Sequence, residues 1–288
     1  MTAGFLPQID ILLNEHFINA SPPAWQESVG SSESILIVPE SQGERTLTIP
    51  GRNERDFAGY GLSSSDSTTL ALRIADALKN SQADSLRLPL LAPTLAQHLV
   101  DILSSSMPNW RFDAALAATS PVALKDAPNF HTSQSLNRAL RSARNRGISF
   151  DDSARFPRFP RDEFEKLHCI RWGSNRKRSW FQMLELLSQL PATSIITARD
   201  AENNLVSCQF DITYNNTRHY YCSASNVKAY SGIGTGILAA SWNAFIADSE
   251  VRNYCFGRGT ERYKFRYANG VRELYELRGF YQPVSIIL

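Results

Sequence analysis

The stretch Tyr254–Tyr267, YCFGRGTERYKFRY, decides both the fold and the site that the sequence predicts. It begins as a short β-like run and then reaches Gly257 and Gly259, which let the backbone turn sharply and approach a ligand closely. A predicted helical turn with Tyr263 and Lys264 follows. A strand, a glycine turn and a helix start bring backbone N–H groups and positive charge to one point. Such a point suits an anion or the oxyanion of an acyl-transfer intermediate.

The part of this stretch written FGRGTERYKFRY resembles the C-terminal signature of the CelD/BcsL-type acyltransferases. This GNAT-fold group is similar to the Fem peptidyltransferases, which build peptidoglycan bridges. The resemblance covers most of the chain and is strongest from Leu136 to Tyr281. It implies an α/β fold with a GNAT-type mixed sheet flanked by helices, in two GNAT-like halves in tandem. Residues 1–125 would form the acceptor-side half and residues 126–288 the acyltransferase domain.

The resemblance also suggests roles within the signature. Fem relatives carry a lysine at the place of Lys264, proposed to stabilise the charge of the intermediate or to hold a donor phosphate. Glu261 is a candidate base or ligand of an acceptor amine, and Tyr263 a candidate general acid. Arg258 is a candidate clamp for phosphate or carboxylate. Structural interpretations stay open, with Tyr263 as a core aromatic and Glu261 as a helix-start acid.

A β-rich region precedes the signature. Thr193–Arg199, Leu205–Tyr214 and Arg218–Ala224 alternate apolar and polar residues between turn signals, which predicts an antiparallel three-stranded meander. This is the order of the central strands in a GNAT domain. An apolar helix that ends near Ala247 is expected next.

Between the meander and that helix lies the glycine-rich segment VKAYSGIGTGILAA, residues 227–240. A glycine-rich loop that opens a helix presents N–H groups to a pyrophosphate, and GNAT enzymes hold coenzyme A there. The residue that usually starts the GNAT loop, Arg or Gln, is replaced here by Ala229 or Ser231, and Lys228 is the nearest cation. The predicted cofactor-binding residues of this loop are Lys228, Ser231, Gly232, Gly234, Thr235 and Gly236.

The most basic segment is SLNRALRSARNRGISFDD, residues 135–152. Arg138, Arg141 and Arg144 recur every third residue, so on a helix they form one positive stripe, and Gly147 ends that helix. The family has a basic helix in this place. Arg138 and Arg141 are therefore candidates for binding the phosphates of a donor, and a solvated arginine face is the alternative.

Two further elements resemble the family. The predicted helix Arg161–Gly173 carries His168 and the pair Arg171-Trp172, which match a His/Arg-Trp element. His168 is either a catalytic base or a structural side chain, and Arg171 and Trp172 are candidate substrate-binding residues. In the polar loop 51–67, Asp56 and Tyr60 resemble an Asp-Tyr loop and are candidates for lining the acceptor site.

The first half shows a fold pattern without chemistry of its own. Apolar runs at 34–39 and 45–50 predict a hairpin around Gly43, and the spacing of apolar residues predicts helices over 9–17, 70–79 and 93–103. SLRLPLL, residues 85–91, and the short apolar pieces 114–118 and 121–124 are candidate strands. This order of strands and helices predicts an α/β half-domain.

Charge is divided unequally along the chain. Residues 1–120 hold 7 Lys and Arg against 13 Asp and Glu, whereas residues 121–288 hold 23 against 15. A basic second half predicts an anionic partner such as a phosphate-bearing cofactor, carrier or nucleic acid, and a surface of salt bridges between the halves is the alternative.

Composition narrows the class of protein. There is no apolar run of about 18 residues, so no membrane span is expected, and the N-terminus lacks a basic region ahead of its apolar residues, so a cytoplasmic location is expected. The four cysteines are scattered without CxxC spacing, which predicts neither a zinc site nor a redox motif.

Three functions are consistent with these patterns. The first is transfer of an acyl group from acyl-CoA, or from the phosphopantetheine of an acyl carrier protein, to an amine or hydroxyl of a small metabolite or sugar. In that case the acyl donor is a co-substrate, and no permanently bound cofactor or metal is expected. The second is aminoacyl transfer from charged tRNA, as in the Fem peptidyltransferases. The third is a degenerate GNAT fold that acts as a binding module.

Overall fold

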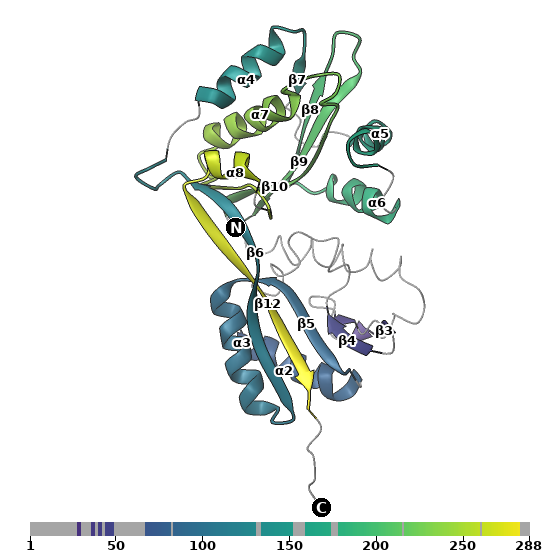
Figure 1. Ribbon diagram of the computed structural model, residues 1–288, viewed down its shortest axis with the longest axis vertical. Helices are drawn as coiled ribbons and strands as arrows, with labels where there is room; N and C mark the ends of the chain where they lie inside the picture. Colours follow the sequence, from purple (N-terminus) through teal and green to yellow (C-terminus); the bar gives the residue numbers. More distant parts are fainter. Residues whose placement is uncertain are drawn as a thin grey trace, which may run out of the picture. The chain divides into compact units, whose positions relative to one another are not determined.

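A computed structural model gives the fold (Figure 1). It describes residues 28–29, 36–37, 40–41, 44–48, 67–81, 83–130, 134–151, 159–173, 178–214, 216–259 and 261–282. The chain divides into unit 1, Met1–Thr119 with Arg272–Leu288, and unit 2, Ser120–Val271. The helix predicted over 9–17 and the loop with Asp56 and Tyr60 lie outside the described residues.

Unit 1 is a mixed sheet with two helices. The sheet order is β1-β2-β4-β5-β12-β6, and β3 pairs with β4. The strands are β1 (Ser28–Val29), β2 (Leu36–Ile37), β3 (Glu40–Ser41), β4 (Glu44–Thr48), β5 (Ser85–Leu91), β6 (Trp110–Leu124) and β12 (Gly270–Tyr281). The antiparallel pairing of β2 with β4 confirms the predicted hairpin. The helices are α2 (Ser67–Ser81) and α3 (Pro93–Ser106), five and three residues longer than predicted.

Spacing explains the core of unit 1. On α2, Leu70, Ile74 and Leu78 recur every fourth residue and are all buried. β5 is buried on both faces except near its middle, which is why SLRLPLL reads as a nearly continuous apolar run. The side chains around α2, α3, β4 and β5 form one aliphatic cluster.

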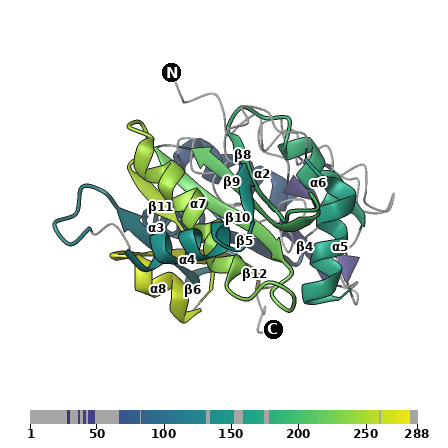
Figure 2. The same ribbon diagram turned by 90° about the horizontal axis from the view of Figure 1, so that it is seen from above.

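Unit 2 is a second mixed sheet between two helical layers. Its order is β6-β11-β10-β9-β8-β7, and in Figures 1 and 2 the sheet lies between α4 with α7 and α5 with α6. The strands are β7 (Ser149–Asp151), β8 (Thr193–Arg199), β9 (Leu205–Tyr214), β10 (Thr217–Ser225) and β11 (Asn253–Cys255). The helices are α4 (Gln134–Arg144), α5 (Arg161–Trp172), α6 (Arg178–Leu187), α7 (Ile233–Ala247) and α8 (Arg262–Tyr267). The antiparallel pairs β8–β9 and β9–β10 confirm the predicted meander.

The same connection occurs once in each unit. β4 and β5 are parallel neighbours joined through α2, and β10 and β11 are parallel neighbours joined through α7. A helical crossover is what a parallel pair requires, because the chain must return to the same end of the sheet. This repeated connection agrees with the tandem arrangement that the sequence predicts.

Two long strands carry the chain between the units. The pieces predicted at 114–118 and 121–124 are one strand, β6, which pairs with β11 at its end. The second long strand is β12, which pairs with β5. Residues from Arg272 onward therefore belong to unit 1, whereas the sequence pattern assigned them to a domain running from 126 to 288.

Candidate functional site

The candidate site lies in unit 2, where β10 and β11 part. Their parallel pairing ends at His219 and Cys255. β11 stops there, while β10 continues to Ser225 along β9, with a bulge between Tyr220 and Cys222. The backbone after Cys255 turns away, and the Phe256 amide donates to the carbonyl of Pro121 on β6. Beyond this point the side of β10 that faced β11 is free of strand pairing.

The predicted glycine turn borders this parting point. Gly257 has φ +73°, and a Cβ on it would lie 3.1 Å from the Tyr220 carbonyl oxygen, so glycine is required. Gly259 has φ +122°, and the Glu261 carboxylate folds over it so closely that a Cβ would lie 2.2 Å from Oε2. The two glycines thus allow the turn to press against β10 and to be covered by Glu261.

Lys264 holds this turn together. Its ammonium, on a side chain that is 5% exposed, donates to the Arg258 carbonyl and lies 3.0 Å from Oε2 of Glu261. The Glu261 side chain remains about half exposed. The predicted residues Arg258, Glu261 and Lys264 therefore lie together, with the lysine charge inside the turn and the carboxylate at its surface.

Two hydroxyl groups of β10 lie beside Tyr263 of α8. The Tyr220 hydroxyl is 2.5 Å from Oγ of Ser223, and a hydrogen bond also joins Tyr220 and Tyr263. Burial raises the pKa of both tyrosines, and Glu261 raises that of Tyr263 further. The positive charge of Arg171 lowers both pKa values and so acts against the effect of burial. Both phenols hold their protons at neutral pH and serve as hydrogen-bond donors.

The first turn of α7 also borders β10. A Cβ on Gly234 would lie 3.8 Å from Oγ of Ser225, five residues along β10 from the Tyr220 carbonyl that Gly257 contacts. Five strand residues span about 16 Å. The two glycine-bearing turns of the sequence are therefore placed along one stretch of one strand.

Several amides of this loop are already bonded. The amides of Thr235 and Gly236 donate to the Gly232 carbonyl, and that of Ile233 donates to Tyr230. The sequence pattern predicted unpaired N–H groups here, but α7 begins early enough to use these three. Gly236 is buried against Phe150 and Ala143 and serves helix packing. Exposed positions at the start of α7 are Lys228, Ser231, Gly232 and Thr235.

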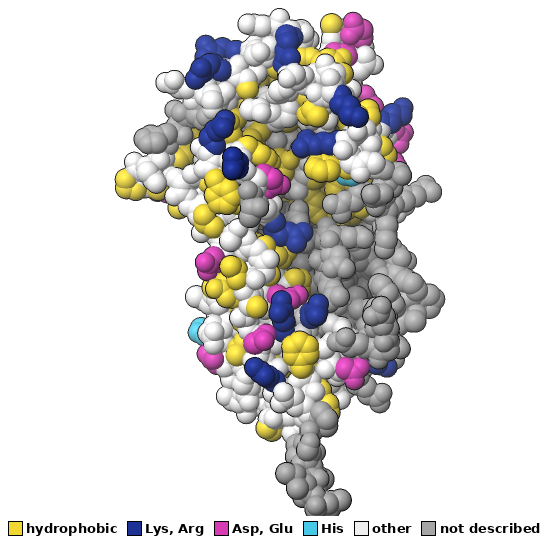
Figure 3. Space-filling view, viewed as in Figure 1, with side chains coloured by type: hydrophobic (Ala, Val, Ile, Leu, Met, Phe, Trp, Pro, Cys, Tyr) yellow, Lys and Arg dark blue, Asp and Glu magenta, His cyan; other side chains and the backbone are white. Residues whose placement is uncertain are grey.

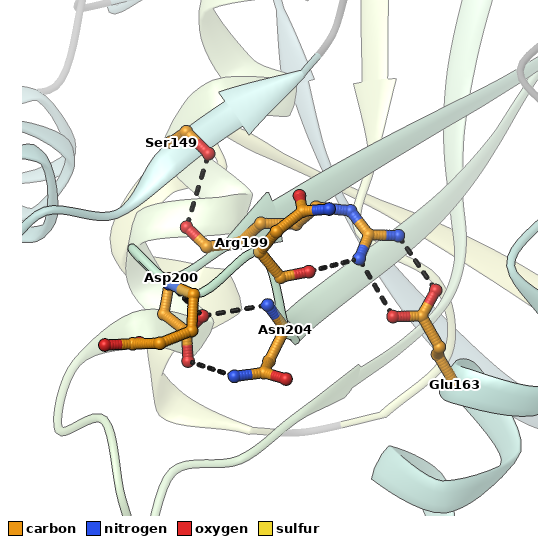
Figure 4. Close-up of polar contacts among 7 residues, drawn as sticks. Ser149, Glu163, Arg199, Asp200 and Asn204 are labelled. Atoms are coloured by element: carbon orange, nitrogen blue, oxygen red, sulfur yellow. Dashed lines mark hydrogen bonds and ion pairs between the residues drawn. The ribbon is translucent and has the colours of Figure 1, made fainter.

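A surface network fixes the same loop from the β8–β9 turn. Asp200 accepts the Tyr230 hydroxyl at 2.7 Å and the Asn204 amide at 2.8 Å. Its pKa is held below the usual value, chiefly by the Tyr230 hydrogen bond. Figure 4 shows the neighbouring Arg199, which donates to both carboxylate oxygens of Glu163 at 2.8 Å. This bidentate pair joins β8 to α5 next to the turn.

A buried charged network lies beside the last β10–β11 pairs. Asp211 accepts Arg218 Nε at 3.1 Å, Ser241 Oγ at 2.5 Å and Gln209 Nε2 at 2.9 Å. The Tyr254 hydroxyl bonds both Gln209 and Ser241, and Arg218 is the register partner of Tyr254. Burial raises the pKa of Asp211, and the charge of Arg218 opposes that rise. The sequence signal for this network was a charged residue inside each of two apolar strands.

The arginine stripe predicted on residues 135–152 is exposed. Arg138, Arg141 and Arg144 face outward from α4, while Leu136, Leu140 and Ala143 are buried. Figure 3 shows several Lys and Arg side chains on the part of this face that α4 occupies. Because Ala143 contacts Gly236, the C-terminal end of α4 lies by the start of α7. Arg144 is thus nearer to the predicted donor loop than Arg138.

The structure separates the residues predicted on α5. His168 is buried among aromatic rings, 5.1 Å from Trp180 and 5.7 Å from Phe181 between ring centroids. Arg171 is exposed, its charge lowers the pKa of both phenols, and its guanidinium carbon lies 4.7 Å from the centroid of the Trp172 ring, a residue that is 56% exposed. Arg171 and Trp172 therefore lie at the edge of the site, and His168 lies in the packing between α5 and α6.

The described part of the chain shows neither a metal-ligand group nor a membrane-spanning helix. No group of three or more His, Cys, Asp or Glu among those residues is placed to hold a metal ion. Among the described helices, none is both long enough and apolar enough to cross a membrane.

Comparison with known proteins rests on structure alone, since no family model and no curated protein matches the sequence. The fold is similar to the C-terminal domain (DUF2156) of a proposed lysylphosphatidylglycerol synthetase from Agrobacterium fabrum. The TM-score is 0.62 at 8% identity, over 94% of this chain and 92% of that one. L-PGS from Bacillus licheniformis gives 0.59 at 12% identity, over 97% and 92%. FemX gives 0.53 at 9% identity, over 85% and 83%.

These likenesses establish the fold. The chain has a GNAT-like, Fem-related fold, with a mixed α/β sheet flanked by helices.

Proposed function

We propose that this chain is an acyltransferase that moves an acyl group from a phosphate-bearing carrier to an amine or hydroxyl of a small metabolite or sugar. The carrier is acyl-CoA or the phosphopantetheine of an acyl carrier protein. The observation that carries the proposal is the parting of β10 and β11 beside Glu261 and Tyr263. An extended thioester arm fits such a gap, because the freed strand side offers main-chain groups to its carbonyl.

Each of the candidate site residues has a role in this reaction. Glu261, half exposed over Gly259, holds the acceptor amine or takes its proton. Tyr263 keeps its proton at neutral pH and delivers it to the leaving group. Lys264 keeps the turn in shape and places positive charge near the reacting carbonyl. Arg171 and Trp172 contact the acceptor, and Arg258 clamps an anionic group.

The donor's phosphates belong at the start of α7. Ser231, Gly232 and Thr235 are exposed there, next to Lys228 and near Arg144 of α4. Positive charge and a helix N-terminus favour a pyrophosphate. The CelD/BcsL-like signature, an acceptor side built by residues 1–125 with Asp56 and Tyr60, and a cytoplasmic location remain predictions within this proposal.

A charged tRNA is the second candidate donor. The exposed arginines of α4, Arg138, Arg141 and Arg144, favour it because several positive charges in a row match successive phosphates. FemX and L-PGS are among the proteins of similar fold. The reaction class is unchanged, since an ester to ribose replaces the thioester as the activated acyl group.

The test begins with mass spectrometry of the purified protein for a bound donor or product. Transfer is then measured from acyl-CoA, acyl carrier protein and aminoacyl-tRNA to a panel of amines and sugars. Glu261→Gln should lower the rate with the active donor by roughly 10²-fold or more. The matched control is Glu250→Gln, which removes an exposed carboxylate outside the site.

Salt dependence separates the donors. Binding of tRNA should weaken steeply with salt, and Arg141→Ala should reduce that slope by roughly one phosphate contact. Arg111→Ala, an exposed arginine of unit 1, is the control. The chain is a binding module instead if two results are found together. Wild type transfers no acyl group from any donor, and Glu261→Gln and Lys264→Ala retain the same bound ligand as wild type in mass spectrometry.

A further inference from the structure

The bulge on β10 places two side chains in line that a regular strand would separate. Residues three apart in a strand point to opposite faces. Here Tyr220 pairs with Asp211 and Ser223 pairs with Gln209, two positions apart on β9, so both lie on one face. The extra residue is Tyr221, whose hydroxyl donates instead to Sδ of Met183 on α6. The bulge therefore allows the side chains of Tyr220 and Ser223 to form a hydrogen bond with each other.

Hydrogen bonds join the three side chains of this trio. The Tyr220 hydroxyl lies 2.5 Å from Oγ of Ser223, and either group can donate. A hydrogen bond also joins Tyr220 to Tyr263, a residue that is 40% exposed. Ser223 is thus connected to Tyr263 through Tyr220.

We propose that Ser223 and Tyr220 are positioning residues that orient the Tyr263 hydroxyl as the proton donor to the leaving group. This inference rests on the proposed function and adds two residues of β10 to its mechanism. The groups that act on the pKa of Tyr263 are Glu261, Tyr220 and Arg171, and those that act on the pKa of Tyr220 are Tyr263, Ser223, Cys222 and Arg171.

The proton balance is as follows. The acceptor nitrogen or oxygen bonds to the acyl carbon, and the bond from that carbon to the carrier's sulfur or ribose oxygen breaks. The leaving atom takes the Tyr263 proton, and the phenolate that remains is stabilised by the donated hydrogen bond from Tyr220. The acceptor's proton then returns to Tyr263. No other reagent is needed.

Chain connectivity also gives the trio its rigidity. The backbone of Tyr220 lies against Gly257. The glycine turn that contains Gly257 leads into α8, and Lys264 of α8 donates a hydrogen bond back to the Arg258 carbonyl of that turn. The phenol of β10 and the phenol of α8 are therefore fixed to the same turn. A hydroxyl donor held within a fraction of an ångström is what efficient proton transfer requires.

The first test needs no substrate. The ionisation of Tyr263 is followed by NMR of the protein labelled with ¹³C at tyrosine Cζ. Tyr220→Phe should make Tyr263 ionise roughly 3- to 10-fold less readily, the value of one net hydrogen bond. Ser223→Ala should have a smaller effect of the same sign. Tyr221→Phe is the matched control, because it removes a hydroxyl from the adjacent residue on the opposite face. An unchanged Tyr263 ionisation in Tyr220→Phe overturns the proposal.

The second test uses whichever donor wild type accepts. Tyr220→Phe should lower kcat roughly 10-fold at an unchanged KM and move the alkaline limb of its pH profile upward. Combined with Tyr263→Phe it should cause no further loss, because both act through one proton. If the losses of kcat in the two single variants multiply in the double variant, the proposal is overturned. If wild type shows no transfer, only the proposed function is rejected. The NMR measurement of Tyr263 ionisation still decides whether the hydroxyls of Ser223, Tyr220 and Tyr263 act together.

Discussion

Unit 1 and unit 2 each contain a parallel strand pair joined through a helix, but the side chains beside the two pairs differ. In unit 1 the parallel pair β4–β5 is bridged by neutral hydroxyls, Thr46 Oγ1 to Ser85 Oγ at 2.9 Å and Thr48 Oγ1 to the Arg87 carbonyl at 2.6 Å. In unit 2 the equivalent pair β10–β11 lies beside a carboxylate and a guanidinium that are almost wholly buried.

The two pairs differ in the free energy that their burial requires. A neutral hydroxyl pair costs little to bury, and the aliphatic cluster around it stabilises unit 1. Buried Asp211 and Arg218 lose hydration, which their attraction and hydrogen bonds must offset. They define the register of β10 just before the strands part, so the unit with the candidate site is also the one with the charged interior. The following predictions test this contrast.

The largest effect is expected from Arg218→Met. It leaves the Asp211 carboxylate buried without its cation, which costs roughly 3–5 kcal/mol. The measurement is the free energy of unfolding in urea. Adding Asp211→Asn to the same chain should recover part of the loss. If Arg218→Met costs less than 1 kcal/mol, the network does not fix the register as argued.

The cost of that variant should depend on pH. Burial raises the pKa of Asp211, and loss of Arg218 raises it further. The folded state then binds the proton more tightly than the unfolded state, so stability falls as pH rises from the ordinary aspartate value through the raised one. The loss in Arg218→Met should be smallest in acid and grow toward neutral pH. A loss that is constant from pH 4 to pH 7, about the expected window, contradicts this.

A medium effect is expected from Gly257→Ala. Its positive φ costs roughly 1–2 kcal/mol for any other residue, and the new Cβ meets the Tyr220 carbonyl. Gly173→Ala is the control, because Gly173 has φ +75° with nothing within 4 Å. Gly257→Ala should therefore unfold more easily than the control and should alone disturb the Tyr263 ionisation. Equal stabilities would mean that the close approach to β10 is unimportant.

A smaller effect is expected from Tyr230→Phe, which removes the hydroxyl that Asp200 accepts. Donor binding should weaken roughly 2- to 10-fold, the range of one net hydrogen bond. Because the pKa of Asp200 is lowered, the contact persists above the ordinary aspartate value and is lost as pH falls through the lowered one. Wild type and variant should bind alike in strong acid. A donor affinity that is unchanged at neutral pH would show that this contact does not hold the loop.

The smallest effect is expected in unit 1. Thr46→Val leaves the buried Ser85 hydroxyl without this partner and should cost about 1 kcal/mol. The double variant with Ser85→Ala should be nearly neutral, measured by the same urea unfolding. A cost as large as that of Arg218→Met would erase the contrast between the units.

Local pattern predicted most of the elements. The apolar spacing of Leu70, Ile74 and Leu78 gave α2, and alternation gave the three strands of the meander. It broke β6 into pieces, because the middle of that strand, at Leu116 and Ala117, is exposed and does not alternate. The signature residues Arg258, Glu261 and Lys264 were found together, since they occupy one turn of sequence. Tyr220 and Ser223 were missed, because a bulge carries no pattern of its own.

The sequence by itself determined the elements, the glycine turn at Gly257 and the positive stripe of α4, because each depends on neighbours within a few residues. Only the tertiary structure decided that Lys264 faces inward, that His168 is packed among rings, and that β10 carries two hydroxyls toward Tyr263. These outcomes depend on contacts between residues far apart in the chain. Burial, pairing register and hydrogen-bond direction are properties of such contacts, and spacing along the sequence does not encode them.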